Sequence, residues 1–230
     1  MIKFFKEKLW VMTLSKFGKG NMLKRLLTKK EKEAIKHIHK GFLHEKGWWK
    51  SWEINESIDS EHNPLPWVTY SFIDFIVERL DKTMIVFEFG LGNSTLFYSS
   101  KVKTIHTVEH DKIWYEKINR KLPTNVNISF IELEPDGAYS RASGLSGEKY
   151  DIIIVDGRDR INCMLNSVNH LNYNGILILD DSERVAYKNG VDDLISKGFK
   201  KIDFWGISPG FQAYNKSTSI FYRSNNVLNI

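Results

Sequence analysis

Cysteine is almost absent from this chain. Cys163 is the only one among 230 residues. A single thiol excludes an intrachain disulfide framework and a zinc site built from several cysteines. It fits a reducing, cytoplasmic setting. A lone thiol inside a predicted helix is most often a small buried residue, and we expect Cys163 to be one.

Long apolar runs are missing as well. No stretch approaches the roughly 20 apolar residues that a membrane-spanning helix needs. The N-terminal stretch MIKFFKEKLWVMTLSKFGK carries lysines throughout, and its longest apolar stretch, 9–14, is too short for the apolar region of a signal peptide. The spacing of Phe5, Leu9 and Met12 predicts a basic amphipathic helix. Such a helix could lie on an anionic membrane surface, which implies a peripheral location at the inner face of a membrane, or it could pack on its own domain or on a partner chain.

Acidic residues are scarce near the N-terminus. Residues 1–50 contain 14 lysines and arginines and 4 acids, a net charge of +10, whereas residues 51–230 contain 19 and 24, a net charge of −5. The overall charge of +5 therefore comes from the N-terminal segment. An acidic main part does not favour an extended nucleic-acid groove, so we do not expect nucleic acid to be its partner.

Turn-forming residues divide the chain into two predicted parts. We expect a basic helical extension with an aromatic loop over residues 1–63, and a main domain over residues 64–230. Residues 47–70, GWWKSWEINESIDSEHNPLPWVTY, contain four of the seven tryptophans and two prolines. The prolines and turn formers argue against a regular element in this stretch. We expect a loop that is pinned against the core or against a ligand.

The main domain alternates apolar runs with helical segments. After the helix predicted by SFIDFIVERL, the pattern predicts right-handed βαβ crossovers and a parallel sheet covered on both faces. Residues 199–224 are typical of a hairpin. We therefore expect an α/β, Rossmann-like three-layer sandwich with a mostly parallel seven-stranded sheet closed by an antiparallel C-terminal hairpin. The first five strands are predicted at 83–90, 103–111, 125–133, 149–157 and 175–181.

Acidic residues end each of these five strands. Ligands of such sheets bind beyond the carboxyl ends of the strands, so the strand-end residues are the first candidates for a site. They are Glu88, Glu109, Glu132, Asp156, Asp180 and Asp181.

The stretch VFEFGLGNST, residues 86–95, combines one of these acids with a glycine-rich loop. It is not a P-loop, because no lysine follows Gly92, and it is not a dinucleotide fingerprint, because Thr95 stands at the third glycine position. Glu88 would also repel a diphosphate bound at the start of the following helix. The loop therefore favours a ligand that carries positive charge.

Glu109 adds a second requirement to the ligand. It ends the second strand about 20 residues after the glycines, where a carboxylate accepts hydrogen bonds from ribose hydroxyls. A nucleoside with an amine-bearing, cationic tail satisfies both acids. S-adenosylmethionine is such a molecule.

These motifs resemble those of the class I S-adenosylmethionine-dependent methyltransferases. The resemblance covers residues 64–225 and is based on VFEFGLGNST, TVEHD, YDIIIVDGRDR and GILILDDS, in that order. It implies that S-adenosylmethionine is the cofactor and that its methionine part contacts Glu88, Gly90, Gly92, Asn93, Ser94 and Thr95. It further implies that Glu109 binds the ribose, that His110 lies beside the adenine and that Asp156 lies near the methyl group. In such enzymes the segment before the first core helix closes over the cofactor, which here would be Trp67, Thr69 and Tyr70.

Methyl transfer requires an aligned acceptor, a base for its proton and the exclusion of water. The candidates for the catalytic step are Asp156, Arg158, Asp159 and Asp181. Methyltransferases of the catechol type bind a divalent cation at positions that correspond to Asp156, Asp181 and Ser182, so Mg²⁺ held by the two acids with waters is one expectation. Ser182 departs from the usual amide, and Asp159 stands where that type has a lysine. The two acids could equally act as base and orienting residue, or Asp181 could only cap the next helix.

The acceptor is predicted more coarsely. The patterns VDGRDR and LDDSERVAY resemble bacterial methyltransferases of surface-polysaccharide pathways, so the main hypothesis is O-methylation of a small molecule or of a sugar or glycan precursor. One alternative is an RNA or protein methyltransferase that docks its substrate on the basic N-terminal arm. Another is a non-catalytic nucleoside-binding or scaffold protein that has kept the fold.

Overall fold

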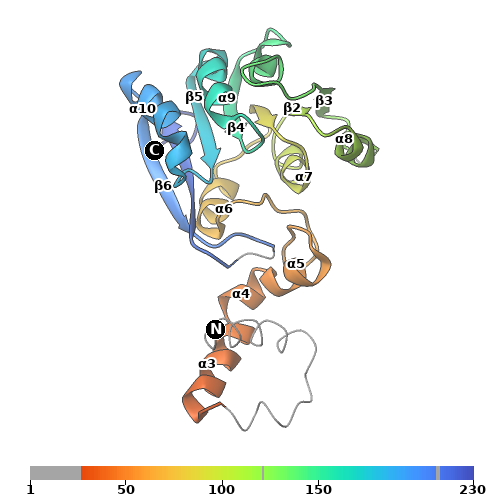
Figure 1. Ribbon diagram of the computed structural model, residues 1–230, viewed down its shortest axis with the longest axis vertical. Helices are drawn as coiled ribbons and strands as arrows, with labels where there is room; N and C mark the ends of the chain where they lie inside the picture. Colours follow the sequence, from red (N-terminus) through yellow and green to blue (C-terminus); the bar gives the residue numbers. More distant parts are fainter. Residues whose placement is uncertain (1–26, 121, 211–212) are drawn as a thin grey trace.

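A computed structural model describes residues 27–120, 122–210 and 213–230. Its centre is one seven-stranded sheet in the order β3-β2-β1-β4-β5-β7-β6 (Figure 1). The five parallel strands are β1 (Ile85–Phe89), β2 (Thr104–Glu109), β3 (Val126–Phe130), β4 (Tyr150–Val155) and β5 (Leu171–Asp180). The final hairpin consists of β6 (Lys200–Gly206) and β7 (Lys216–Tyr222), and β7 pairs antiparallel with both β5 and β6. The predicted fold class is confirmed.

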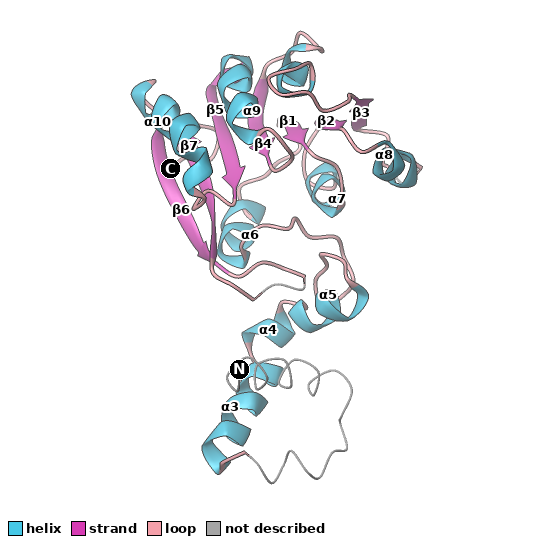
Figure 2. Ribbon diagram, viewed as in Figure 1, coloured by secondary structure: helices cyan, strands magenta, loops and turns pink. Residues whose placement is uncertain are grey.

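Helices cover both faces of the sheet, which gives three layers (Figure 2). Successive strand residues point to opposite faces. Val86 therefore packs with α6 (Tyr70–Val77) and α7 (Asn93–Ser99), whereas Phe87 packs with α9 (Arg160–Ser167) and α10 (Lys188–Ser196). Because the central strands are buried on both faces, their sequences are continuous apolar runs.

Shorter elements complete the layers. Helix α8 (Lys112–Asn119) contacts β2 and β3, and the 3₁₀ helix η1 (Tyr139–Gly144) occupies the connection between β3 and β4. Two further 3₁₀ turns, η2 (Val168–His170) and η3 (Val185–Tyr187), flank β5. Cys163 of α9 is fully buried, as expected.

The prediction of an irregular segment over residues 47–70 is partly wrong. Helix α5 occupies Trp48–Ile54, and the two prolines lie beyond its end, where they do not interrupt it. Trp48 and Trp52 share one face of α5, with ring centroids 5.2 Å apart. Trp48 is buried in the same cluster as Val86 of β1, so part of the tryptophan cluster is core packing.

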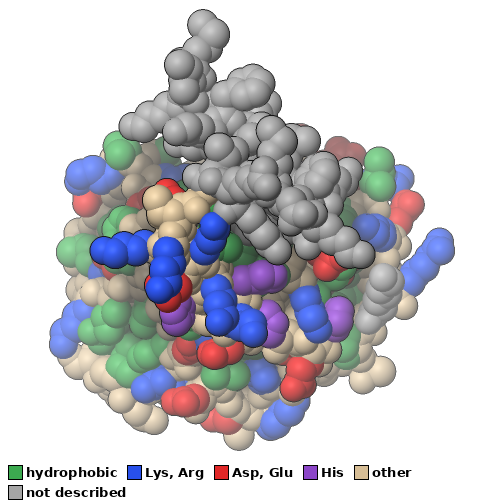
Figure 3. All heavy atoms as spheres, turned by 90° about the horizontal axis from the view of Figure 1, so that it is seen from below, with side chains coloured by type: hydrophobic (Ala, Val, Ile, Leu, Met, Phe, Trp, Pro, Cys, Tyr) green, Lys and Arg blue, Asp and Glu red, His purple; other side chains and the backbone are tan. Residues whose placement is uncertain are grey.

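The N-terminal part of the described chain extends away from the sheet. Helix α3 (Lys29–Lys40) begins with a capping box, in which the Thr28 N–H donates to Glu31 Oε2 and the Glu31 N–H donates to Thr28 Oγ1. None of the residues of α3 is buried. Helix α4 (Phe42–Glu45) links it to α5. Seen from below, lysine and histidine side chains gather on this side of the molecule (Figure 3).

Two sequence predictions about this region remain predictions. The amphipathic helix expected around Phe5 and Leu9 lies outside the described residues. The boundary between the predicted extension and the main domain, between residues 63 and 64, is the second prediction. Among the described helices, none is both long and apolar enough to cross a membrane.

Candidate functional site

The sheet changes direction between β1 and β4. From β1 the chain proceeds outward through β2 and β3, and from β4 it proceeds the other way through β5. Ligands of open α/β sheets bind in the crevice at such a switch point, beyond the carboxyl ends of the strands. Glu88 lies at the end of β1 and Asp156 directly follows β4. The structure therefore places these two predicted site residues at neighbouring strand ends, beside the switch point.

Glu88 is a buried carboxyl group held by the helix that follows it. Only 1% of the residue is exposed, and Oε2 accepts a hydrogen bond of 2.5 Å from Thr95 Oγ1. Burial raises the pKa of Glu88 to about 7, while hydrogen bonds from Ser94 and Thr95 oppose the shift. Glu88 therefore changes its charge in the physiological pH range, and a cationic ligand would favour its ionised form.

The turn after β1 depends on glycine at one position. Gly90 has φ +115°, a conformation that side chains disfavour, and its N–H donates to the Val108 carbonyl over 3.0 Å. A second glycine, Gly157, packs against this strand end: a Cβ there would lie 2.1 Å from Tyr139 Oη and 3.0 Å from the Phe89 carbonyl oxygen. The loops after β1 and β4 can therefore approach each other closely.

Helix α7 begins without a side-chain cap. Gly92 holds the N-cap position, and its N–H donates to Thr95 Oγ1 over 3.2 Å. Asn93 instead donates from Nδ2 to the Ser57 carbonyl over 2.8 Å. The amide of Asn93 therefore attaches the start of α7 to the segment that follows α5.

Glu109 is oriented by the backbone that follows it. Its Oε1 accepts hydrogen bonds of 2.7 Å from the N–H groups of His110 and Asp111, and it lies 2.9 Å from His110 Nδ1. Among the described residues, no group donates to Oε2. A carboxylate with one oxygen fixed and the other available is suited to accept a ribose hydroxyl.

Asp156 pairs with a cation that the sequence analysis did not single out. Arg160, the first residue of α9, places Nη2 3.1 Å from Asp156 Oδ1, and the same guanidinium donates to the Asp180 carbonyl over 2.6 Å. Burial and the neighbouring Asp180 raise the pKa of Asp156, and Arg160 opposes this shift. One-fifth of the Asp156 side chain remains exposed.

A second buried cation joins the two acids that end β5. Lys216, the first residue of β7, is 5% exposed and has Nζ 2.5 Å from Asp180 Oδ2 and 2.7 Å from Asp181 Oδ1. Asp181 also pairs with Arg184 and lies 3.5 Å from Arg160. Burial would raise the pKa of Asp181, but Lys216 and the two arginines outweigh it and lower the pKa.

These contacts do not fit the predicted Mg²⁺. Asp156 and Asp181 are the two proposed ligands, and both are already neutralised by arginine or lysine side chains. A divalent cation needs several free oxygen ligands. Within the described ranges, no group of three or more His, Cys, Asp and Glu side chains could hold a metal. The Mg²⁺ expectation is therefore not supported.

Two other candidates for the catalytic step have different environments. Asp159 accepts hydrogen bonds of 2.9 Å from the Asp136 N–H and from Asn162 Nδ2, which ties the start of α9 to the preceding loop. Arg158 is exposed. The structure does not bring either side chain into contact with Glu88 or Asp156.

The segment before α6 lies at this edge of the sheet, but mainly through its backbone. The Trp67 carbonyl accepts from Lys216 Nζ over 3.3 Å. Thr69 is buried, with its N–H donating to Thr218 Oγ1 over 3.1 Å and its hydroxyl to the Phe204 carbonyl over 3.0 Å. Tyr70 is also buried, and burial raises its pKa. Thr69 and Tyr70 therefore contribute to packing in this structure, whereas Trp67 is 39% exposed.

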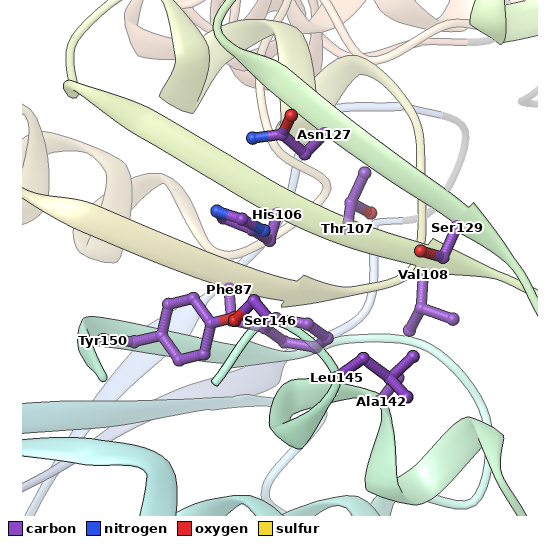
Figure 4. Close-up of a pocket in the computed structure, with 10 residues that line it drawn as sticks. All are labelled: Phe87, His106, Thr107, Val108, Asn127, Ser129, Ala142, Leu145, Ser146 and Tyr150. Atoms are coloured by element: carbon purple, nitrogen blue, oxygen red, sulfur yellow. The ribbon is translucent and has the colours of Figure 1, made fainter. Parts of the chain in front are cut away.

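A cavity of about 270 Å³ lies away from these residues, on the sheet face under η1 (Figure 4). His106 and Tyr150 line it, with Glu148 Oε2 3.1 Å from His106 Nε2 and Ser146 Oγ 2.7 Å from Tyr150 Oη. None of the predicted site residues is among its lining residues.

Sequence reasoning missed Arg160 and Lys216. Arg160 is one of several charged residues in VDGRDR. Only the turn after β4 shows which of them points back to the strand ends. Lys216 begins the strand KSTSIFY, and its place beside the acidic end of β5 follows only from the antiparallel pairing of β5 with β7.

Comparisons with known proteins address the fold. No protein-family model and no curated protein sequence matches the chain. A solved structure from Staphylococcus aureus, provisionally designated a caffeoyl-CoA O-methyltransferase, superimposes with a TM-score of 0.51 and 16% identity, covering 84% of this chain and 98% of that one. A methyltransferase-like protein from Silicibacter pomeroyi gives a TM-score of 0.49 and 17% identity over 70% and 89% of the two chains. With the strand order and the hairpin described above, the chain has the Rossmann-like fold of the class I S-adenosylmethionine-dependent methyltransferases.

Proposed function

We propose that this protein is an S-adenosylmethionine-dependent methyltransferase whose cofactor lies between Glu88 and Glu109. The observation that carries the proposal is the pair of buried carboxyl groups at the ends of adjacent strands, β1 and β2, beside the switch point. Glu109 Oε2 would accept a ribose hydroxyl. Glu88 would face the cationic methionine part. A cofactor with a diphosphate at this place would bring negative charge instead.

The cofactor, when bound, supplies a methyl group on a positively charged sulfur. The protein must then align the acceptor and remove its proton. Asp156 is the candidate base that would accept this proton, because its carboxyl group is partly exposed and its pKa is raised. Arg160 would hold that carboxyl group in place. We assign no role to a metal ion.

For the acceptor we propose a hydroxyl group on a small molecule, such as a sugar or a glycan precursor. The support is limited to the residues of the crevice: Asp156 and the exposed indole of Trp67 at its rim suit a neutral, hydroxyl-bearing ring. The excess of basic residues is confined to the N-terminal segment of the sequence, residues 1–50.

Isothermal titration with S-adenosylmethionine and S-adenosylhomocysteine tests the cofactor site. The wild type should bind both, and Glu109→Ala and Glu88→Ala should each weaken binding at least tenfold. Glu148→Ala is a matched control, because Glu148 is an acid at the cavity under η1 and not at the crevice. No binding by the wild type, or equal binding by all variants, would refute the proposal.

Helix α3 gives the alternative acceptor, RNA, a specific observation in its favour. Five lysines are exposed on this helix, with His37 and His39 beside them. RNA held by such a surface would bind more weakly as salt increases, because counterions are released on binding. Binding that is absent, or that does not depend on salt, would exclude this alternative.

A further inference from the structure

The segment Ser57–Thr69, here called the covering segment, is fixed at both ends to the carboxyl edge of the sheet. At its start, Asn93 Nδ2 donates to the Ser57 carbonyl over 2.8 Å. Within it, the Leu65 N–H donates to the Ser57 carbonyl over 2.9 Å, and Ile58 and Pro64 form an isolated bridge. The segment is therefore folded back on itself and runs between the start of α7 and the start of β7.

At its end, the covering segment is attached to the buried charge cluster. Lys216 Nζ donates to the Trp67 carbonyl over 3.3 Å. Two residues later, the Thr69 N–H donates to Thr218 Oγ1, which in turn donates to Asp180 Oδ1 over 2.7 Å. Lys216 and Thr218 thus connect the same acid, Asp180, to the same short stretch of backbone.

We propose that Lys216 is a positioning residue that attaches the covering segment to the strand ends and thereby shapes the cofactor crevice. It acts through Asp180, Asp181 and the Trp67 carbonyl, and not by touching the reacting atoms. The inference rests on the proposed function in one respect, that the crevice beneath the covering segment is the cofactor site.

The environment of Lys216 explains why a lysine can occupy this buried position. Burial would lower the pKa of Lys216, but Asp180, Asp156 and Asp181 raise it, so the ammonium remains charged. An ammonium has three donors, and here three oxygens receive them, one each from Asp180, Asp181 and Trp67. The other charged groups around these acids are Arg160 from α9 and Arg184 from the loop after β5.

Hydrogen exchange of the ligand-free protein tests the attachment. In Asp180→Asn/Lys216→Met, which removes one acid and one base together, amides of residues 57–69 should exchange at least tenfold faster relative to the amides of β1. Lys197→Met is the matched control, because Lys197 pairs with Asp193 on the surface of α10 and should leave the ratio unchanged. Using β1 of the same variant as reference cancels a general loss of stability.

An unchanged ratio overturns the proposal, whether or not the strands exchange faster. If the double variant does not fold, the ratio in Lys216→Arg decides, because arginine keeps the charge but cannot place one compact ammonium between three oxygens. We expect that ratio to rise about threefold, and no rise overturns the proposal.

Titration of the same variants with S-adenosylhomocysteine tests the consequence for the crevice. Affinity should fall at least fivefold in Asp180→Asn/Lys216→Met and remain unchanged in Lys197→Met. Unchanged affinity with a loosened segment overturns the positioning role. If the wild type binds no S-adenosylhomocysteine, the proposed function fails, while the exchange ratio still tests the attachment.

Discussion

Glu88 shows how a single side chain can decide between classes of ligand. An ionised carboxyl group at the end of β1 would repel a diphosphate, and its nearly complete burial reduces the screening of this effect by solvent. Burial also raises its pKa to about 7, so the ligand-free protein holds a proton there that the unfolded chain, with a pKa near 4.5, releases.

The pH dependence of Glu88→Gln follows from this shift. Because the pKa of Glu88 is higher in the folded state, the wild type loses stability as pH rises from about 4.5 to about 7, by up to about 3 kcal/mol. The free energy of unfolding of Glu88→Gln should therefore fall less than that of the wild type between pH 5 and pH 8. Urea unfolding at both pH values measures this difference. Equal losses in both proteins would contradict the environment described for Glu88.

Cofactor affinity should depend on pH in the opposite direction. The ionised form of Glu88 attracts the amine, so binding of S-adenosylmethionine to the wild type should weaken as pH falls from 8 to 5, by up to about tenfold per pH unit below 7. Glu88→Gln should bind weakly at every pH. A flat profile for the wild type would argue against contact between Glu88 and the cationic part of the cofactor.

At this scale the sequence predicts acids better than their partners. Glu88 and Glu109 were predictable because strand ends can be recognised from apolar runs and because the glycines mark the loop. Lys216 was not predictable, because its role depends on the pairing of β5 with β7. This pairing brings Lys216 beside Asp180, which lies 36 residues earlier in the chain. The contacts of Thr69 could not be predicted for a similar reason, since its partners, Phe204 and Thr218, belong to the final hairpin.

Among the elements, the turn after β4 sets how closely the two central strands approach at the site. Gly157 leaves room for Tyr139 of η1 and for the Phe89 carbonyl at the end of β1. The loops that carry Glu88 and Asp156 are thereby packed together.

Gly157→Ala should destabilise the protein by roughly 1–3 kcal/mol, because the added Cβ overlaps the Tyr139 hydroxyl. Adding Tyr139→Phe removes that oxygen and should restore about half of the lost stability, since the Phe89 carbonyl still crowds the Cβ. Thermal or urea unfolding of the single and double variants measures both effects. A double variant no more stable than Gly157→Ala would contradict this packing.

The element boundaries show where sequence reasoning works and where it does not. The central strands β1, β4 and β5 were predictable because burial on both faces makes their sequences continuously apolar. The sequence prediction misses helix α5, because the prolines at 64 and 66 disrupt regular structure only near themselves and not at Trp48–Ile54. The spacing of Trp48 and Trp52, which places both on one helical face, was the overlooked signal.

For the whole molecule, the charge is divided between two regions. The N-terminal segment is basic, whereas the carboxyl edge of the sheet holds acids that are balanced by Arg160 and Lys216. The predicted fold could be read from the order of the elements, but the acceptor could not, because it depends on side chains that face the crevice from separate loops.

The balanced charges predict that cofactor binding does not require a metal ion. Asp156 and Asp181 already have cationic partners, so EDTA should leave the affinity for S-adenosylhomocysteine unchanged, and added Mg²⁺ should not improve it. Titrations with and without each additive measure this. A loss of affinity in EDTA that Mg²⁺ restores would contradict the charge pairing seen at the strand ends.

A crystal structure with S-adenosylhomocysteine tests the proposed cofactor site most directly. We predict the ribose hydroxyls on Glu109 Oε2, the homocysteine part at the turn that carries Glu88 and Gly90, and the sulfur facing Asp156. A nucleoside bound elsewhere, for instance in the cavity beside His106, or a ribose that makes no contact with Glu109, would contradict it.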